Sequence, residues 1–145
     1  MHTISLPATT EGVARVAREV AERGAAAGLP PARAYKLRLA AEEIATNIVD
    51  HGFGRAPRDP VPEFGFEWDC DEEWVRVHLV DEAGPFDPTS APVPPDLDAP
   101  LEERRMGGLG IHLVRASTDE FRYERRGRLN RVTLGLRRCR VGRAV

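Results

Sequence analysis

Apolar residues recur along this chain at two spacings, and each spacing predicts a different element. A spacing of three and four residues, typical of an amphipathic helix, covers residues 10–27, where Val13, Val16 and Val20 share one face. A second helix is expected over residues 30–50, because the prolines at its start suit a first helical turn. Short runs of strand-forming residues between turn signals predict strands at residues 2–7, 63–69, 74–81, 120–125 and 131–138.

The pattern breaks down in the middle of the chain. Six prolines lie between residues 84 and 100, with little periodicity. A loop of that length inside a compact domain is usually functional, as in an active-site lid, or disordered. We therefore expect a mobile lid over residues 84–106, followed by a glycine-rich segment and a helix over residues 111–117.

The order of these elements predicts the fold class. The predicted elements follow the order strand, helix, helix, strand, strand, lid, helix, strand, strand. This order is typical of an α/β two-layer sandwich, with a mixed sheet covered by helices on one face. The 145 residues, of which 41% are hydrophobic and 30% charged, suffice for one domain over residues 1–145 with a buried core.

Composition excludes several classes of function. A formal charge of −2 argues against a nucleic-acid binder, and no apolar stretch is long enough to span a bilayer. The N-terminus lacks the basic and apolar regions of a signal peptide, so a cytoplasmic protein is expected. Lys36 is the only lysine, and it lies outside any GxxxxGK[ST] pattern, which excludes a P-loop nucleotide site.

The second predicted helix carries polar residues along the border of its apolar stripe. Glu43, Asn47 and His51 are spaced four residues apart, so that they form one row on the helix surface. Two interpretations are open: a solvated helix flank, or a carboxylate and an amide that project into a pocket. In a pocket, a carboxylate can accept a proton and an amide oxygen is a hard ligand suited to Mg²⁺.

Asp81 lies where the strand over residues 74–81 ends. It continues the phase of Val75, Val77 and Leu79, which places its carboxylate on the core side of the sheet. Either it caps the following turn, as Asp before Gly-Pro often does, or it accepts a hydrogen bond from the amine of a buried ligand.

The third candidate is the segment Gly107-Gly108-Leu109-Gly110. Glycines before a helix let the backbone approach a phosphate, and the free N–H groups of the helix then bind the anion. By itself this signal is weak, and it does not match the dinucleotide-binding pattern, because the third glycine and a βαβ unit are missing.

In this order along the chain, the three candidates resemble the nucleotide site of the GHKL ATPases, the superfamily that includes the histidine kinases. Within that superfamily the chain is similar to the stand-alone anti-sigma-factor serine/threonine kinases. The resemblance covers essentially the whole chain, and it implies a Bergerat-type ATP-binding fold. The segments that carry it are LRLAAEEIATNIVDHG, VDEAGPFDP, LEERRMGGLGIHLV and NRVTL.

The resemblance also implies roles for individual residues. Glu43 would be the catalytic base and Asn47 the ligand of Mg²⁺, while Asp81 would bind the adenine amino group. The residues expected to bind the nucleotide are Asn47, Asp81, Ala83, Gly84, Phe86, Arg105, Gly107, Gly108, Leu109, Gly110 and Thr133. The chain departs from the family at Ala83, where many relatives have a glycine, and this difference bears on nucleotide affinity.

The implied function is partner switching. A kinase of this kind transfers phosphate from ATP to a serine or threonine of an anti-sigma-factor antagonist, and it sequesters a sigma factor; some relatives form homodimers. The alternative is a module that binds its partner in a nucleotide-dependent way but transfers no phosphate. A base at Glu43 favours the kinase. A histidine-kinase fragment is disfavoured, because the sequence has no helix pair with a phospho-acceptor histidine.

Overall fold

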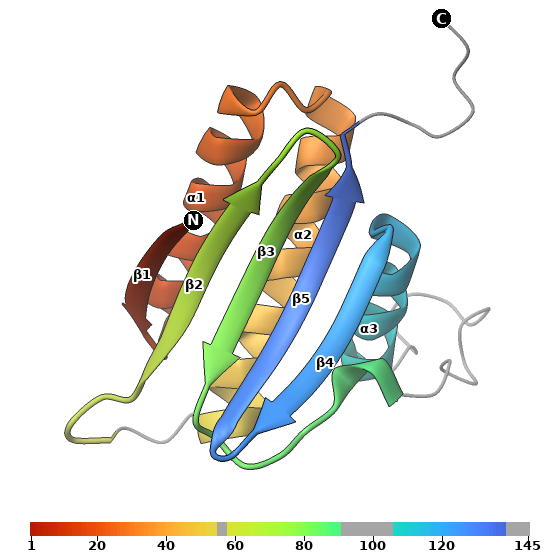
Figure 1. The fold of residues 1–145 in the computed structure, drawn as a ribbon. Coiled ribbons are helices and arrows are strands. Elements are labelled where there is room, and N and C mark those ends of the chain that lie inside the picture. Colours follow the sequence, from red (N-terminus) through yellow and green to blue (C-terminus); the bar gives the residue numbers. More distant parts are fainter. Residues whose placement is uncertain (55–57, 91–105, 139–145) are drawn as a thin grey trace, which may run out of the picture.

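The computed structural model describes residues 1–54, 58–90 and 106–138 (Figure 1). For residues 106–109 it describes the backbone but not the side chains. The predicted lid falls mostly on residues 91–105, outside these ranges, so its mobility stays a prediction. The strands are β1 (His2–Pro7), β2 (Glu63–Cys70), β3 (Trp74–Asp81), β4 (Glu120–Arg126) and β5 (Leu129–Arg137). The helices are α1 (Thr10–Ala26), α2 (Pro31–Asn47) and α3 (Met106–Ser117), with short helical turns at Ile48–Phe53 and Pro88–Ser90.

The two-layer α/β architecture predicted from the sequence is confirmed. The five strands form one sheet in the order β1-β2-β3-β5-β4, and the three helices cover the same face (Figure 1). One detail differs: the sheet is antiparallel throughout instead of mixed. The reason is that β5 inserts between β3 and β4, which run in the same direction and would otherwise pair in parallel.

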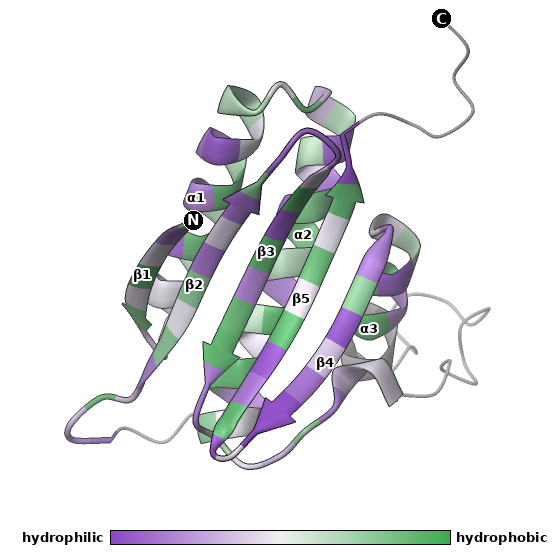
Figure 2. Cartoon of the chain, in the orientation of Figure 1, coloured by the Kyte–Doolittle hydropathy of each residue, from purple (hydrophilic) through white to green (hydrophobic). Residues whose placement is uncertain are grey.

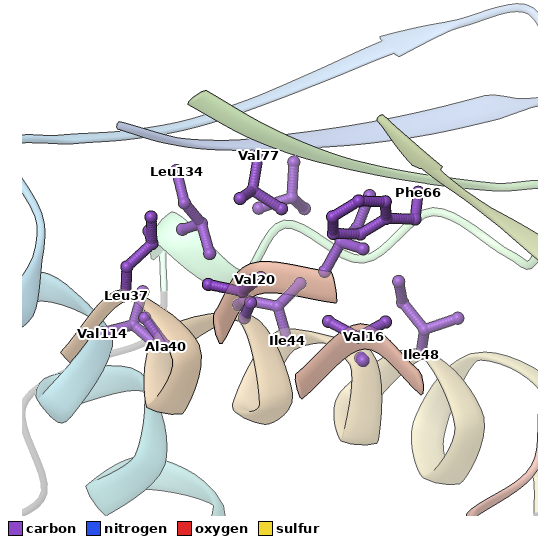
Figure 3. Packing of buried hydrophobic residues seen from close by; sticks show 14 of the residues in the cluster. Val16, Val20, Leu37, Ala40, Ile44, Ile48, Phe66, Val77, Val114 and Leu134 are labelled. Atoms are coloured by element: carbon purple, nitrogen blue, oxygen red, sulfur yellow. The ribbon is translucent and has the colours of Figure 1, made fainter. Parts of the chain in front are cut away.

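The core lies between the sheet and the helices (Figure 3). Val16 and Val20 of α1 and Ile44 of α2 point toward Phe66 and the other inward side chains of the sheet, and all of these side chains are buried. Such burial is the main driving force of folding, and it fixes which face of α2 meets the sheet. The polar border of α2 is thereby held at the edge of the core.

The edge strand β4 is more polar than the strands at the centre of the sheet. Figure 2 shows the outermost strand β4 as mostly hydrophilic, while β3 and β5 carry most of the apolar positions. Among the described helices, none is both long and apolar enough to cross a membrane.

The helix α3 begins earlier than expected. It starts at Met106, so Gly107, Gly108 and Gly110 belong to its first turns and do not precede it. The prediction that these glycines form a loop before a helix at residue 111 is therefore wrong. Helical hydrogen bonding outweighs the low helix propensity of glycine here.

Candidate functional site

A small, partly open pocket lies where β3 ends beside α2. Its walls are mostly apolar and carry three polar side chains, those of Asn47, Asp81 and Asn130. Small-molecule sites typically combine an apolar lining with a few converging polar groups. The lining residues are Ile44, Asn47, Ile48, Gly52, Asp81, Ala83, Gly84, Phe86, Pro88, Asn130 and Val132.

Asp81 is placed as its phase in the strand predicted. Its side chain is on the core face of β3, and the residue is only 6% exposed. Oδ1 accepts hydrogen bonds from the backbone N–H of Ala83 (2.8 Å) and from Nδ2 of Asn130 (2.9 Å). Oδ2 receives no hydrogen bond from any residue in the described ranges. One oxygen thus caps the turn, and the other has no hydrogen-bond partner among the described residues.

Asn47 lies at the C-terminal end of α2, with Ile44 and Ile48 beside it in the pocket lining. The residue is only 8% exposed, and its side-chain amide makes no hydrogen bond within the part of the chain that the structure describes. A buried amide without a partner is costly, so this position favours a bound group that supplies one.

Glu43 lies one turn before Asn47, on the side of α2 that faces α3. It is half-buried, and a Cβ built on Gly110 would be only 1.8 Å from its Oε1. The carboxylate therefore rests directly against the backbone of α3 at Gly110. Burial, with a smaller contribution from the negative charge of Asp50, raises the pKa of the Glu43 carboxyl group.

The remaining predicted residues fall into two groups. The structure brings Ala83, Gly84 and Phe86 to the pocket, and Gly110 to Glu43. Gly107, Gly108 and Leu109 belong to α3, but the structure describes only their backbone. Arg105 lies outside the described residues.

Thr133 does not lie in the pocket, contrary to the prediction. It is paired with His78 on the opposite face of the sheet, where its Oγ1 is 2.8 Å from Nδ1 of His78. Side chains alternate between the faces of a strand, so Thr133 cannot share a face with Val132, which lines the pocket.

The residue that sequence reasoning missed is Asn130. It shares the inward phase of Val132, Leu134 and Leu136 along β5, and it lies directly opposite Asp81 in the strand register. Those inward-facing apolar residues were a usable signal, because extending their alternation by one step places residue 130 on the pocket side.

The sequence profile of the histidine kinase-like ATPase domain matches residues 6–136. The chain belongs to the histidine kinase-like ATPase family. It is also similar to the serine/threonine-protein kinase BtrW of Bordetella bronchiseptica, with 34% identity over 100 residues. The alignment covers 69% of this chain and 68% of that kinase.

The pocket suits the nucleotide implied by the family. Its apolar walls resemble those that contact a purine base, and Oδ2 of Asp81 and the amide of Asn47 have no hydrogen-bond partner among the described residues. The described residues include no group of three or more His, Cys, Asp or Glu side chains that could hold a metal by themselves. Mg²⁺ is commonly held by one or two protein oxygens together with phosphates and water, so the amide oxygen of Asn47 is compatible with such a site.

The raised pKa of Glu43 predicts a specific dependence of stability on pH. The window lies between pH 4.5, the ordinary pKa of a glutamate carboxyl group, and the raised pKa of Glu43 in the folded protein. Within this pH window, the folded protein binds more protons at Glu43 than the unfolded chain does. Stability contributed by this group therefore decreases as pH rises through that window. Glu43→Gln removes the titration, so the variant should gain stability relative to the wild type as pH increases. Urea unfolding of both proteins at a series of pH values measures the difference; a constant difference would contradict the assignment.

Proposed function

We propose that this protein is a cytoplasmic serine/threonine kinase of the anti-sigma-factor type. It would transfer phosphate from ATP to a serine or threonine hydroxyl of an anti-sigma-factor antagonist, and it would sequester a sigma factor. The observation that carries the proposal is Asp81, a buried carboxylate in the pocket lining. Its Oδ1 accepts hydrogen bonds from the protein, whereas Oδ2 accepts none from the described residues. The similarity to a serine/threonine-protein kinase supports the reaction class.

The pocket residues have distinct roles in this proposal. Oδ2 of Asp81 accepts a hydrogen bond from the exocyclic amine of adenine, while Ile44, Ile48 and Val132 supply apolar contacts to the ring. Asn47 holds Mg²⁺ through its amide oxygen. The bound metal neutralises charge on the phosphates.

Glu43 is the base of the proposed reaction. The partner's hydroxyl oxygen bonds to the γ-phosphorus, the bond from that phosphorus to the bridging oxygen breaks, and ADP leaves. The hydroxyl proton passes to the Glu43 carboxylate. Its raised pKa makes the carboxylate a better proton acceptor than an ordinary glutamate. Gly110 leaves room for that carboxylate beside α3.

Asp81→Asn tests the nucleotide assignment. The variant replaces a charged acceptor with a neutral amide, so binding of ADP with Mg²⁺ should weaken by more than about 1 kcal/mol. Isothermal titration calorimetry measures the change. Glu82→Gln is the matched control, because it makes the same chemical change one residue further along, at an exposed position. Absence of binding by the wild type, or equal affinity of Asp81→Asn and the wild type, would contradict the assignment.

A further inference from the structure

Asn130 uses its whole side-chain amide to connect the end of β3 with the turn that follows. The residue is only 4% exposed. Its Nδ2 lies within hydrogen-bond distance of Oδ1 of Asp81 (2.9 Å), of the carbonyl oxygen of Ala83 (3.0 Å) and of that of Gly84 (3.1 Å). The two N–H groups of the amide are shared among these three acceptors. Three acceptors thus converge on one amino group, and all three belong to the segment that lines the pocket.

Two donors from the edge strand β4 fix the orientation of this amide. Oδ1 of Asn130 accepts hydrogen bonds from the Tyr123 hydroxyl (2.6 Å) and from Nη1 of Arg125 (2.9 Å). A flipped amide would turn its amino group toward these donors and its oxygen toward the three acceptors, so only one orientation satisfies the network. Arg125 also donates directly to the carbonyl oxygen of Ala83 (3.2 Å).

This network limits what the pocket can offer to a ligand. The carbonyl oxygens of Ala83 and Gly84 and Oδ1 of Asp81 already accept hydrogen bonds from the protein. The two hydrogen bonds to Oδ1 restrict rotation of the Asp81 carboxylate. Of the acceptors at the end of β3, Oδ2 of Asp81 is therefore the one without a hydrogen-bond partner in the described ranges, and the bonds to Oδ1 restrict its direction. A site built to accept a hydrogen bond from a ligand rejects an analogue that lacks the donor.

We propose that Tyr123, Arg125 and Asn130 are positioning residues that set the base selectivity of the pocket. They hold Asp81 so that its Oδ2 accepts a hydrogen bond from a purine with an amino group at position 6. A purine with an oxygen at position 6 would place an acceptor against Oδ2, and no hydrogen bond could form. The inference rests on the proposed nucleotide site and adds that selectivity depends on the edge strand β4. Neither Tyr123 nor Arg125 is among the residues that line the pocket.

The test compares two ligands across three variants. Arg125→Met and Tyr123→Phe each remove one donor to Asn130 at a partly exposed edge position, where the fold is expected to tolerate the change. Arg126→Met is the matched control: the same substitution at the adjacent residue, whose side chain is 83% exposed and contacts Glu124. Affinities for ADP and for inosine diphosphate, each with Mg²⁺, are measured by calorimetry, and urea unfolding reports stability.

The wild type and Arg126→Met should prefer ADP. In Arg125→Met and Tyr123→Phe, ADP affinity should fall by about 3- to 10-fold while inosine diphosphate affinity changes little, so that the preference narrows. An unchanged preference in both variants would overturn the inference and leave the proposed function intact. The inference would also be overturned if the affinities for ADP and inosine diphosphate fell equally and the free energy of unfolding fell with them. The network would then have only a structural role. A wild type that binds neither ligand would overturn the proposed function itself.

Discussion

Glu43→Gln is expected to bind ATP as well as the wild type and to lose nearly all phosphate transfer. Glutamine keeps the size of the side chain but removes the basic oxygen. A general base contributes about 10²- to 10⁴-fold to the rate, whereas nucleotide binding depends on Asp81, Asn47 and the pocket walls. Radiolabelled ATP and a partner protein that copurifies with the wild type suffice to measure transfer, and calorimetry measures binding.

Glu42→Gln is the control for this experiment. It makes the same change one residue earlier on α2, where the side chain pairs with Arg38 at 3.6 Å on the helix surface. Transfer by Glu42→Gln should equal that of the wild type. If Glu43→Gln also transfers at the wild-type rate, Glu43 is not the base. If the wild type phosphorylates no copurifying partner, the protein is a nucleotide-dependent binding module.

Gly110→Ala should impair phosphate transfer far more than it impairs folding. A Cβ at this position would overlap Oε1 of Glu43, which is the far end of a flexible side chain and can move aside. The fold should therefore survive, but the carboxylate would be displaced from its place beside α3. A misplacement of about 1 Å can lower a reaction rate about 10²-fold, so we expect a loss of that order. Transfer assays and urea unfolding, run in parallel, separate the two effects.

Two comparisons test whether the loss of phosphate transfer in Gly110→Ala results from displacement of the Glu43 carboxylate. Gly24→Ala is the matched control in α1, because a Cβ there would make ordinary contacts with Ala34 (3.4 Å) and Leu29 (3.5 Å). Introduced into Glu43→Gln, the Gly110→Ala substitution should lower the residual transfer only slightly, since residues that act together give non-additive effects. Fully additive losses would mean that Gly110 acts independently of Glu43.

Several features of the site could be predicted from local sequence. The phase of Val75, Val77 and Leu79 was enough to place Asp81 on the core side at the end of β3. The four-residue spacing of Glu43 and Asn47 was enough to place both on the border of the apolar stripe of α2. These predictions succeeded because the period of a helix or a strand relates the direction of one side chain to that of its neighbours.

The assignment of Thr133 failed for the same physical reason. Thr133 was assigned by its residue type alone. The alternation of side chains along β5 places it on the face of the sheet opposite the pocket. Asn130, three residues earlier, has the phase of Val132 and faces Asp81. A shift by an odd number of residues reverses the face of a strand, so strand phase had to decide between the two.

The sequence by itself determined the order and type of the helices and strands, the two-layer architecture and the positions of Glu43, Asn47 and Asp81 on their elements. Only the tertiary structure decided that β5 inserts between β3 and β4, which brings Asn130 opposite Asp81. The same holds for the contact of Glu43 with Gly110, 67 residues further along the chain. Periodicity is a local property that fixes directions within one element, whereas these pairings depend on how elements distant in sequence pack to bury a common core.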